Sequence, residues 1–514
     1  MPVKQRKRIL SLLLCLLLTG CAQTDLPETE DLTPIPLLEE QPESPSRSIL
    51  PEVFSLPYAP DQSLDPITCP DGMQQTVSSL LYESLFRLNE QLEPQPWLCE
   101  SYTYAPSEDG KNNWVYTFFL RGGVVFSDGT PLTAEDVKVS LDRAKASLRY
   151  GSRFDQVRSV SAEGNTVTVT LSRPNTGFPA LLDIPIVKSG TEDAAAPIGT
   201  GPYLFSTTDT TAYLVANQSW WRKERLPVDL ITLTEAADRD TMLYRFTSHD
   251  VQLVTADLTG TAPITASGNI SYQDAHTTVL QYIGCNTVRE PLNGQMLRRA
   301  LSLGFNRAHL VSGFLSGHAV AAQFPVSPVT DLYPTELEER YSLEAFTEAL
   351  AASGYEPQRT LSLLVNSENS FKVSIAGYLA ETYTAAGVPV EVRALPWEEY
   401  TAALTAGDFD LYYGEVKLTA DWDLTPLLGS GSTLNHSGKT DPVTDQLLAD
   451  FIASEDRPAA MEALCRHLRS QSSIFPLCFE STSVLMQTDV VENLSSTTTE
   501  PFYGLTSCTI HLHH

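Results

Sequence analysis

The sequence has few positive charges. Its 514 residues include 34 Lys and Arg against 63 Asp and Glu, which gives a formal net charge of −29. A surface of this sign repels the phosphates of nucleic acids and the headgroups of anionic lipids. We therefore expect no nucleic-acid partner. An acidic surface would favour cationic ligands weakly. More often such a surface only keeps a protein soluble.

The apolar run near the N-terminus is too short to span a membrane. It covers residues 9–19 and follows the basic residues Lys4, Arg6, Lys7 and Arg8. Its end, Leu18-Thr19-Gly20-Cys21, matches the bacterial lipobox. We predict a signal peptide at 1–20, cleavage before Cys21, and lipid on the Cys21 sulfur as a membrane anchor.

The next segment, 21–50, has too little apolar content to fold. It is rich in proline and in acidic residues. Such a composition cannot offset the entropy lost on ordering. We predict a disordered, lipidated tether between the membrane and the folded body.

Cysteine is scarce and never occurs in a C-x-x-C or zinc-finger spacing. Of eight cysteines, Cys15 belongs to the signal peptide and Cys21 to the lipobox. An exported protein can form disulfides, but spacing alone does not assign pairs. We expect structural or free thiols at the other six, which are Cys69, Cys99, Cys285, Cys465, Cys478 and Cys508.

Motifs of hydrolases are missing as well. The chain has no H-E-x-x-H and no G-x-S-x-G nucleophile elbow. The glycine-serine stretch at 429–432 reads as a flexible turn. The terminal His511, His513 and His514 would bind metal only adventitiously. We predict no catalytic residue, no metal site and no cofactor.

The most informative stretch is 114–144. Aromatic and β-branched residues predict a strand at 114–120, and 124–126 predicts a second, short strand. Asp128-Gly129 is a turn signal. Thr133 and Asp136 then predict the capped start of a helix.

This stretch resembles the most characteristic segment of the family 5 solute-binding proteins. These are the extracytoplasmic receptors of oligopeptide, dipeptide and nickel ABC importers. Members read F-x-L-R-x-G-x-x-F-x-D-G-x-P-x-x-A-x-D-V, and the chain matches every fixed position from Phe118 to Val137 without a gap. The matching residues are Phe118, Leu120, Arg121, Gly123, Phe126, Asp128, Gly129, Pro131, Ala134, Asp136 and Val137.

A second family signature lies at 197–203, P-I-G-T-G-P-Y. Its glycines suit a tight turn where two stretches of backbone pass close together. The N-P-x-Y-W that usually follows is degraded here to N-Q-S-W-W at 217–221.

Strand and helix patterns alternate through 342–413, which predicts an α/β region with a partly parallel sheet. The resemblance implies a two-lobed periplasmic-binding-protein-like fold of the class II type, with an extra subdomain in the first lobe. Crossover strands at 279–286 and 474–479 would join the lobes.

The predicted domains follow the same resemblance. We expect a first lobe at 51–284, with the extra subdomain at 70–180. The second lobe would cover 285–470, and 471–514 would return to the first lobe.

The resemblance also implies where a ligand is held. In peptide-binding members an aspartate that follows a strand and a small residue grips the α-ammonium of the peptide, and Asp421 matches that position. Trp422 follows it. The proline comes later here than is common in the family, so Asp423 is the alternative anchor. The site hypothesis therefore names Asp421, Trp422 and Asp423 as ligand-binding residues.

We accordingly expect a monomeric lipoprotein that captures peptides and delivers them to an ABC permease in the membrane. The alternatives are a receptor for nickel, a metal chelate or another small solute of the same family, and, with less support, a secreted hydrolase.

Overall fold

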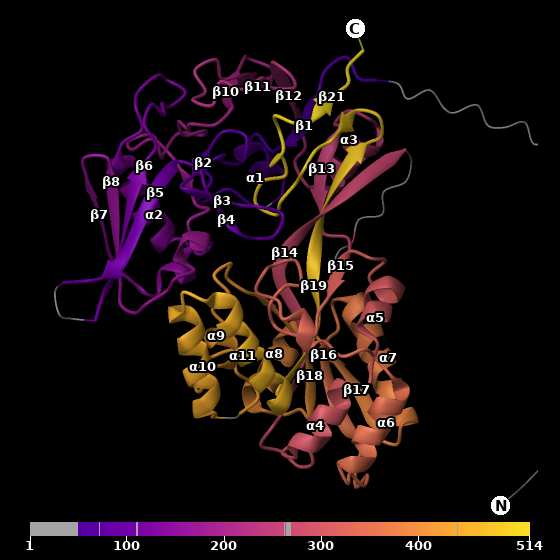
Figure 1. Cartoon of the computed structure of the whole chain (residues 1–514). Helices are drawn as coiled ribbons and strands as arrows, with labels where there is room; N and C mark the ends of the chain where they lie inside the picture. Colours follow the sequence, from indigo (N-terminus) through magenta and orange to yellow (C-terminus); the bar gives the residue numbers. More distant parts are fainter. Residues whose placement is uncertain are drawn as a thin grey trace, which may run out of the picture. The chain divides into compact units, whose positions relative to one another are not determined.

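The computed structural model describes residues 50–513, except 71, 109–111, 262, 264–268 and 439 (Figure 1). The predicted signal peptide, the tether up to residue 49 and Cys21 lie outside the described residues. The described residues belong to one compact unit. The domain boundaries proposed within 51–514 therefore stay predictions.

The largest sheet has seven strands and mixes parallel with antiparallel pairs. Its order is β13-β19-β14-β18-β16-β17, with β15 beside β19. β16 runs parallel to both β17 and β18, as the alternation of strands and helices predicts. The strands are β13 Leu253–Ala256, β14 Ile270–Cys285, β15 Ala319–Ala321, β16 Leu361–Asn366, β17 Val390–Leu395, β18 Leu411–Lys417 and β19 Ile474–Gln487.

Both faces of this sheet are buried. Tyr412 of β18 and Phe479 of β19 belong to one core, whereas Tyr413 and Cys478 belong to another. Successive side chains of a strand point to opposite faces, so the two cores lie on opposite sides. The first core includes side chains of α8 Trp397–Ala406, α9 Thr425–Leu428, α10 Pro442–Ala453 and α11 Arg457–Gln471. The second includes side chains of α4 Gln295–Ser302, α5 Arg307–Phe314, α6 Leu343–Ala352 and α7 Ser370–Ala385.

The two longest strands pair with each other and confirm the strands predicted at 279–286 and 474–479. The antiparallel register of β14 and β19 runs from Ile270 opposite Gln487 to Gly284 opposite Ile474. β13 pairs with one end of β19, and β18 pairs with the other end of β14 (Figure 1). The β14–β19 pair therefore links the two ends of the sheet.

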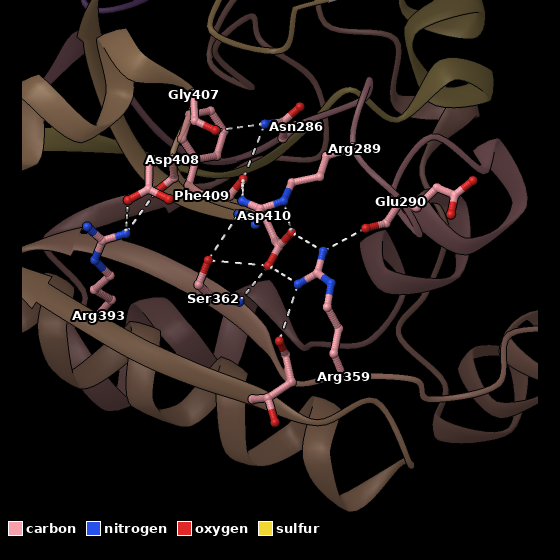
Figure 2. A network of polar contacts seen from close by, with 11 residues as sticks. Asn286, Arg289, Glu290, Arg359, Ser362, Arg393, Gly407, Asp408, Phe409 and Asp410 are labelled. Carbon is pink, nitrogen blue, oxygen red and sulfur yellow. Dashed lines mark hydrogen bonds and ion pairs between the residues drawn. The ribbon is translucent and has the colours of Figure 1, made fainter.

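A polar network fixes the start of β18 (Figure 2). Arg359 donates two hydrogen bonds of 2.6 Å to the two carboxylate oxygens of Asp410, and the amide of Ser362 donates a third at 2.9 Å. Asn286, just after β14, donates to the carbonyl of Phe409 at 3.2 Å. Burial by itself would raise the pKa of Asp410, but Arg359 and the Ser362 amide hold it below its ordinary value.

We predict that acid destabilises the protein partly through Asp410. A carboxyl group whose pKa is lower in the folded than in the unfolded state stabilises the fold. This contribution is fully present at pH values above the unfolded-state pKa, and it is lost as the pH falls through the folded-state pKa. Asp410→Asn should lower the free energy of unfolding at neutral pH by about 3 kcal/mol. It should also flatten the loss of stability below about pH 4.

Urea unfolding followed by circular dichroism at several pH values measures both effects. Asp408→Asn is the control, because Asp408 is exposed and pairs only at the surface, with Arg393 at 2.7 Å. An acid dependence that is equally steep in Asp410→Asn and in the unaltered protein would contradict the assignment.

A four-stranded sheet contains the first strand of the described chain, and the C-terminal segment packs against it. Its order is β1-β12-β11-β10, and β1 Ser55–Tyr58 runs parallel to β12 Leu230–Glu235. β10 Tyr203–Thr207 and β11 Ala212–Ala216 complete it. Phe502 and Leu505 of the C-terminal segment pack into its core.

Gly199 and Gly201 confirm the close backbone approach predicted at 197–203. A Cβ at Gly199 would lie 2.1 Å from the carbonyl oxygen of Leu81, and one at Gly201 would lie 2.5 Å from the carbonyl carbon. The amide of Gly201 donates to Leu81 O at 3.0 Å. A side chain at either position would push the two segments apart.

The third sheet is antiparallel, with order β5-β6-β8-β7. Its strands are β5 Cys99–Pro106, β6 Trp114–Leu120, β7 Val157–Glu163 and β8 Thr166–Leu171, and α2 Ala134–Ala146 packs on it. The predicted helix start is confirmed, because Thr133 and Asp136 form a reciprocal capping box.

The short strand predicted at 124–126 is wrong. That segment makes only an isolated bridge between Val125 and Pro131. The amide of Phe126 donates to Thr130 O at 2.8 Å and that of Leu132 to Val124 O at 3.0 Å. These bonds connect the two sides of the turn at Asp128-Gly129. The main-chain amide and carbonyl groups of the segment therefore pair within the turn and not with a neighbouring strand.

The two tryptophans of the degraded signature, Trp220 and Trp221, share a structural partner with Trp97. The indole N–H groups of Trp97, Trp220 and Trp221 donate to the carboxylate of Glu83 at 2.9, 3.1 and 2.8 Å. Thr200 donates to the same carboxylate at 2.8 Å. Burial raises the pKa of Glu83, and these donors oppose the rise.

The six cysteines expected to be structural or free thiols are all free and buried. The remaining helices and strands are short. They are α1 Met73–Ser78, α3 Arg239–Thr247, β2 Glu83–Ser84, β3 Phe86–Leu88, β4 Pro94–Pro96, β9 Pro185–Ile186, β20 Val491–Glu492 and β21 Thr509–Ile510.

Candidate ligand-binding site

Asp421 lies in the loop after β18 and is only 2% exposed. Its Oδ2 accepts a hydrogen bond from Asn175 Nδ2 at 2.8 Å. Its main-chain oxygen accepts one from Arg457 of α11. Among the described residues, no cationic nitrogen lies within 4.0 Å of the Asp421 carboxylate. Burial raises the pKa of this carboxyl group.

The third sheet holds Asn175 in place. The hydroxyl of Tyr116 on β6 donates to Asn175 O at 2.9 Å, and the Asn175 amide donates to Tyr104 Oη on β5 at 3.0 Å. The amide of Gly177 donates to Asn175 Oδ1 at 2.9 Å. With its oxygen so occupied, the side chain presents its NH₂ group to Asp421.

Residues 173–177, which we call the bridging segment, make further contacts with the same part of the chain. Arg173 pairs with Asp423 at 2.6 Å. Thr176 donates through its amide to Ile452 O at 3.0 Å and through its hydroxyl to Ser454 O at 2.7 Å. The bridging segment therefore connects the third sheet to the 421–423 loop and to the end of α10.

Trp422 points away from these polar groups. Its side chain is 2% exposed and meets Phe479 edge to face at 5.7 Å between ring centroids. Its φ of 59° turns the backbone so that Asp421 and Asp423 can face the bridging segment while the indole stays in the core. The structure thus brings Asp421 and Asp423 together, and a ligand contact by Trp422 stays a prediction.

The residues that meet Asp421 and Asp423 were not found from the sequence. Arg173, Asn175 and Arg457 belong to no motif, and Asn175 stands 246 positions before Asp421. Only the tertiary fold brings them together.

One cluster on the crossover strands combines a serine, a histidine and an aspartate. Ser483 donates to Asp274 at 2.5 Å, and His318 Nδ1 lies 3.1 Å from the same carboxylate. In a catalytic triad the histidine stands between the serine and the carboxylate. Here the carboxylate stands in the middle, so His318 is not placed to take the proton of Ser483.

The described residues contain no group of three or more His, Cys, Asp and Glu side chains placed to hold a metal ion. Of the terminal histidines, His511 lies 3.3 Å from Glu492. His514 lies outside the described residues.

A family model of bacterial extracellular solute-binding proteins, family 5, matches residues 93–433. The chain belongs to this family. It is therefore an extracellular solute-binding protein. Glutathione-binding protein GsiB of Escherichia coli (strain K12) is 26% identical over 422 residues, which cover 77% of this chain and 81% of the relative.

Solved structures confirm the two-lobed periplasmic-binding-protein fold. A nickel ABC transporter protein from Bacillus halodurans matches with a TM-score of 0.74 and 21% identity, over 90% of this chain and 100% of that one. The oligopeptide-binding protein AppA from Bacillus subtilis, in complex with a nonapeptide, matches with a TM-score of 0.59 and 20% identity, over 90% and 99%. Within the described residues, no helix has the length and apolar character needed to span a membrane.

We predict that Asn175→Ala weakens the contact between the bridging segment and the 421–423 loop. The variant removes a donor to a buried carboxylate, which should lower the free energy of unfolding by about 1.5–3 kcal/mol. Urea unfolding gives this value, and hydrogen exchange should show faster exchange of amides in the 419–425 loop.

Asn165→Ala is the control for that experiment. Asn165 also belongs to the third sheet's connections, but it donates to a neutral carbonyl, Leu120 O, at 2.7 Å. Exchange at 419–425 that is no faster in Asn175→Ala than in Asn165→Ala would show that the Asn175–Asp421 bond does not hold the loop.

Proposed function

We propose that the chain captures peptides at the 421–423 loop and delivers them to a membrane permease. The Asp421 carboxylate carries this proposal. It is buried and faces the bridging segment, and its side-chain hydrogen bonds come from the neutral groups of Asn175 and Thr419. The nearby cation Arg457 donates to the main-chain oxygen of Asp421 instead. A buried carboxylate without a directly bonded cation is unfavourable, so a ligand ammonium is a suitable partner.

The α-ammonium of a peptide meets this requirement. It is a compact cation with three donors, and charge-assisted hydrogen bonds are about twice as strong as neutral ones. The backbone of an extended peptide could then bond to exposed main-chain groups, as in strand addition. The names of two relatives, a glutathione-binding protein and an oligopeptide-binding protein, support a ligand of this class.

No step of this function makes or breaks a bond. The contacts among Ser483, Asp274 and His318 lack the order that a nucleophile and base require, which supports a receptor rather than a hydrolase.

We predict that Asp421→Asn weakens peptide binding by about 2–5 kcal/mol, because it removes one partner of a buried charge pair. Isothermal titration calorimetry measures the loss, with a mixture of short peptides or a peptide identified by mass spectrometry of the co-purifying ligand. N-acetylation of the same peptide, which removes the ammonium charge, should abolish binding to the unaltered protein.

Two variants make this test specific. Asp423→Asn tests the alternative anchor, whose carboxylate already pairs with Arg173. Asp450→Asn is the control, because Asp450 is exposed on α10 and contacts Gln446 on the same helix. If N-acetylated and free peptides bind equally well, or if Asp421→Asn binds as tightly as Asp450→Asn, Asp421 does not hold the ammonium.

A nickel or metal-chelate receptor is the alternative within the family, and the Bacillus halodurans relative carries a nickel name. Titration with Ni²⁺ alone and with Ni²⁺ plus free histidine separates the two functions. Binding of either, without competition by peptides, would favour the alternative.

The membrane anchor belongs to this proposal, as does the monomeric state. We predict that Cys21→Ser abolishes labelling by a radioactive fatty acid in bacterial cells and releases the protein from the membrane fraction, because Cys21 would carry the lipid. Cys15→Ser, which alters only the signal peptide, should leave labelling unchanged. Equal labelling of Cys21→Ser and the unaltered protein would exclude Cys21 as the modified residue.

A further inference from the structure

A cavity of about 580 Å³ opens beside α4, α5 and the end of α11, apart from the 421–423 loop. It has the size of a small-molecule site, for which about 300–1,000 Å³ is typical. Its apolar lining includes the buried rings of Phe305, Phe324 and Phe475.

Four arginines line this cavity, which is unusual for a chain with 34 basic residues and a net charge of −29. They are Arg299, Arg307, Arg340 and Arg469. Its lining includes two carboxylates, those of Glu338 and Glu339. Arg299 and Arg469 both approach Glu339, the second at 3.7 Å. The lining therefore has more positive than negative groups.

Arg307, the first residue of α5, is half-buried and has no carboxylate partner among the described residues. Its Nε donates to Pro476 O at 2.7 Å and its Nη2 to Ser302 O at 3.3 Å. Its guanidinium carbon lies 4.5 Å from the centre of the Phe305 ring. Burial lowers the pKa of Arg307 to about 10. Among the described residues, no carboxylate oxygen lies within 4.0 Å of this guanidinium or that of Arg340.

Arg340, which also lines the cavity, is a second arginine without a carboxylate within 4.0 Å among the described residues. It is exposed and follows Glu339, whose amide donates to Gln323 Oε1 at 3.1 Å, while Gln323 Nε2 donates to Glu339 O at 2.8 Å. These two bonds fix the backbone of the 338–341 segment against the cavity. The main chain beside Arg340 is therefore fixed, and its guanidinium group is left without a carboxylate partner among the described residues.

We propose that this cavity is a second ligand site, which binds a small organic anion with a carboxylate or phosphate group. Arg307 and Arg340 would hold the oxyanion, since the guanidinium fork matches carboxylate and phosphate geometry. The apolar part of the anion would lie against the accessible side chains of Leu303 and Tyr341, which also line the cavity. The site differs from the peptide site in both position and charge, so it does not depend on the proposed function.

Calorimetry with phenyl phosphate and benzoate, each a ring with one oxyanion, tests this proposal on the mature protein. We expect saturable binding of one molecule per chain that weakens with added NaCl. Arg340→Gln should raise the Kd at least about tenfold, since it removes a charged hydrogen-bond donor to the oxyanion. Arg307→Gln should do the same. Arg307→Lys, which keeps the charge but loses the fork, should lie between Arg307→Gln and the unaltered protein.

Two controls locate the site. Arg466→Gln changes a 58% exposed arginine on α11 that pairs with Glu462 outside the cavity, and it should leave the Kd unchanged. Asp421→Asn should also bind the anions normally. Because Arg340 is exposed, Arg340→Gln should fold even if Arg307→Gln does not.

Absence of saturable binding by both probes would overturn the proposal. So would a Kd in Arg340→Gln equal to that in Arg466→Gln, because the anion would then bind elsewhere. A Kd raised by Asp421→Asn as much as by Arg340→Gln would likewise place the anion outside this cavity.

Discussion

The pairing of β14 with β19 is the constraint on which the other parts of the fold depend. These two strands form the middle of the seven-stranded sheet, with β13 attached at one end of the pair and β18 at the other. A slip of either strand by one residue would turn all its side chains to the opposite faces of the sheet. Since each face has its own core, both cores would lose their packing together. The position of the 421–423 loop follows from this register through β18 and the Asp410 network.

Much of the local structure could be predicted because its cause is local. Thr133 and Asp136 are three positions apart, and their capping box needs no other part of the chain. The strand predicted at 114–120 forms β6 with the same bounds. The strand prediction at 124–126 was wrong for a related reason. The main-chain groups of this segment bond across the adjacent turn to residues 130–132, so they do not pair with a neighbouring strand. A short apolar run does not show whether a partner strand lies beside it.

The candidate site could be predicted only in part. A motif pointed to Asp421 and Asp423, but nothing near them in sequence pointed to Asn175, which meets Asp421 from 246 positions away. Trp422 illustrates the second limit. Its left-handed backbone and its contact with the ring of Phe479 place the indole in the core, which the sequence did not show, and a ligand contact by Trp422 stays a prediction. Which way a loop side chain points depends on packing, and sequence spacing does not specify it.

The contact between Asn175 and Asp421 has a property that suits a receptor. A hydrogen bond from a neutral amide to a carboxylate contributes about 1.5–3 kcal/mol, enough to hold two segments together without a ligand. It leaves the Asp421 carboxylate without a directly bonded cation, however, since Arg457 donates to the main-chain oxygen instead. A ligand ammonium group would supply both hydrogen bonds and charge. A lysine or arginine in place of Asn175 would satisfy the carboxylate permanently and compete with any cationic ligand. Under the proposed function, the neutral Asn175 would hold the loop weakly enough for a ligand ammonium to replace it.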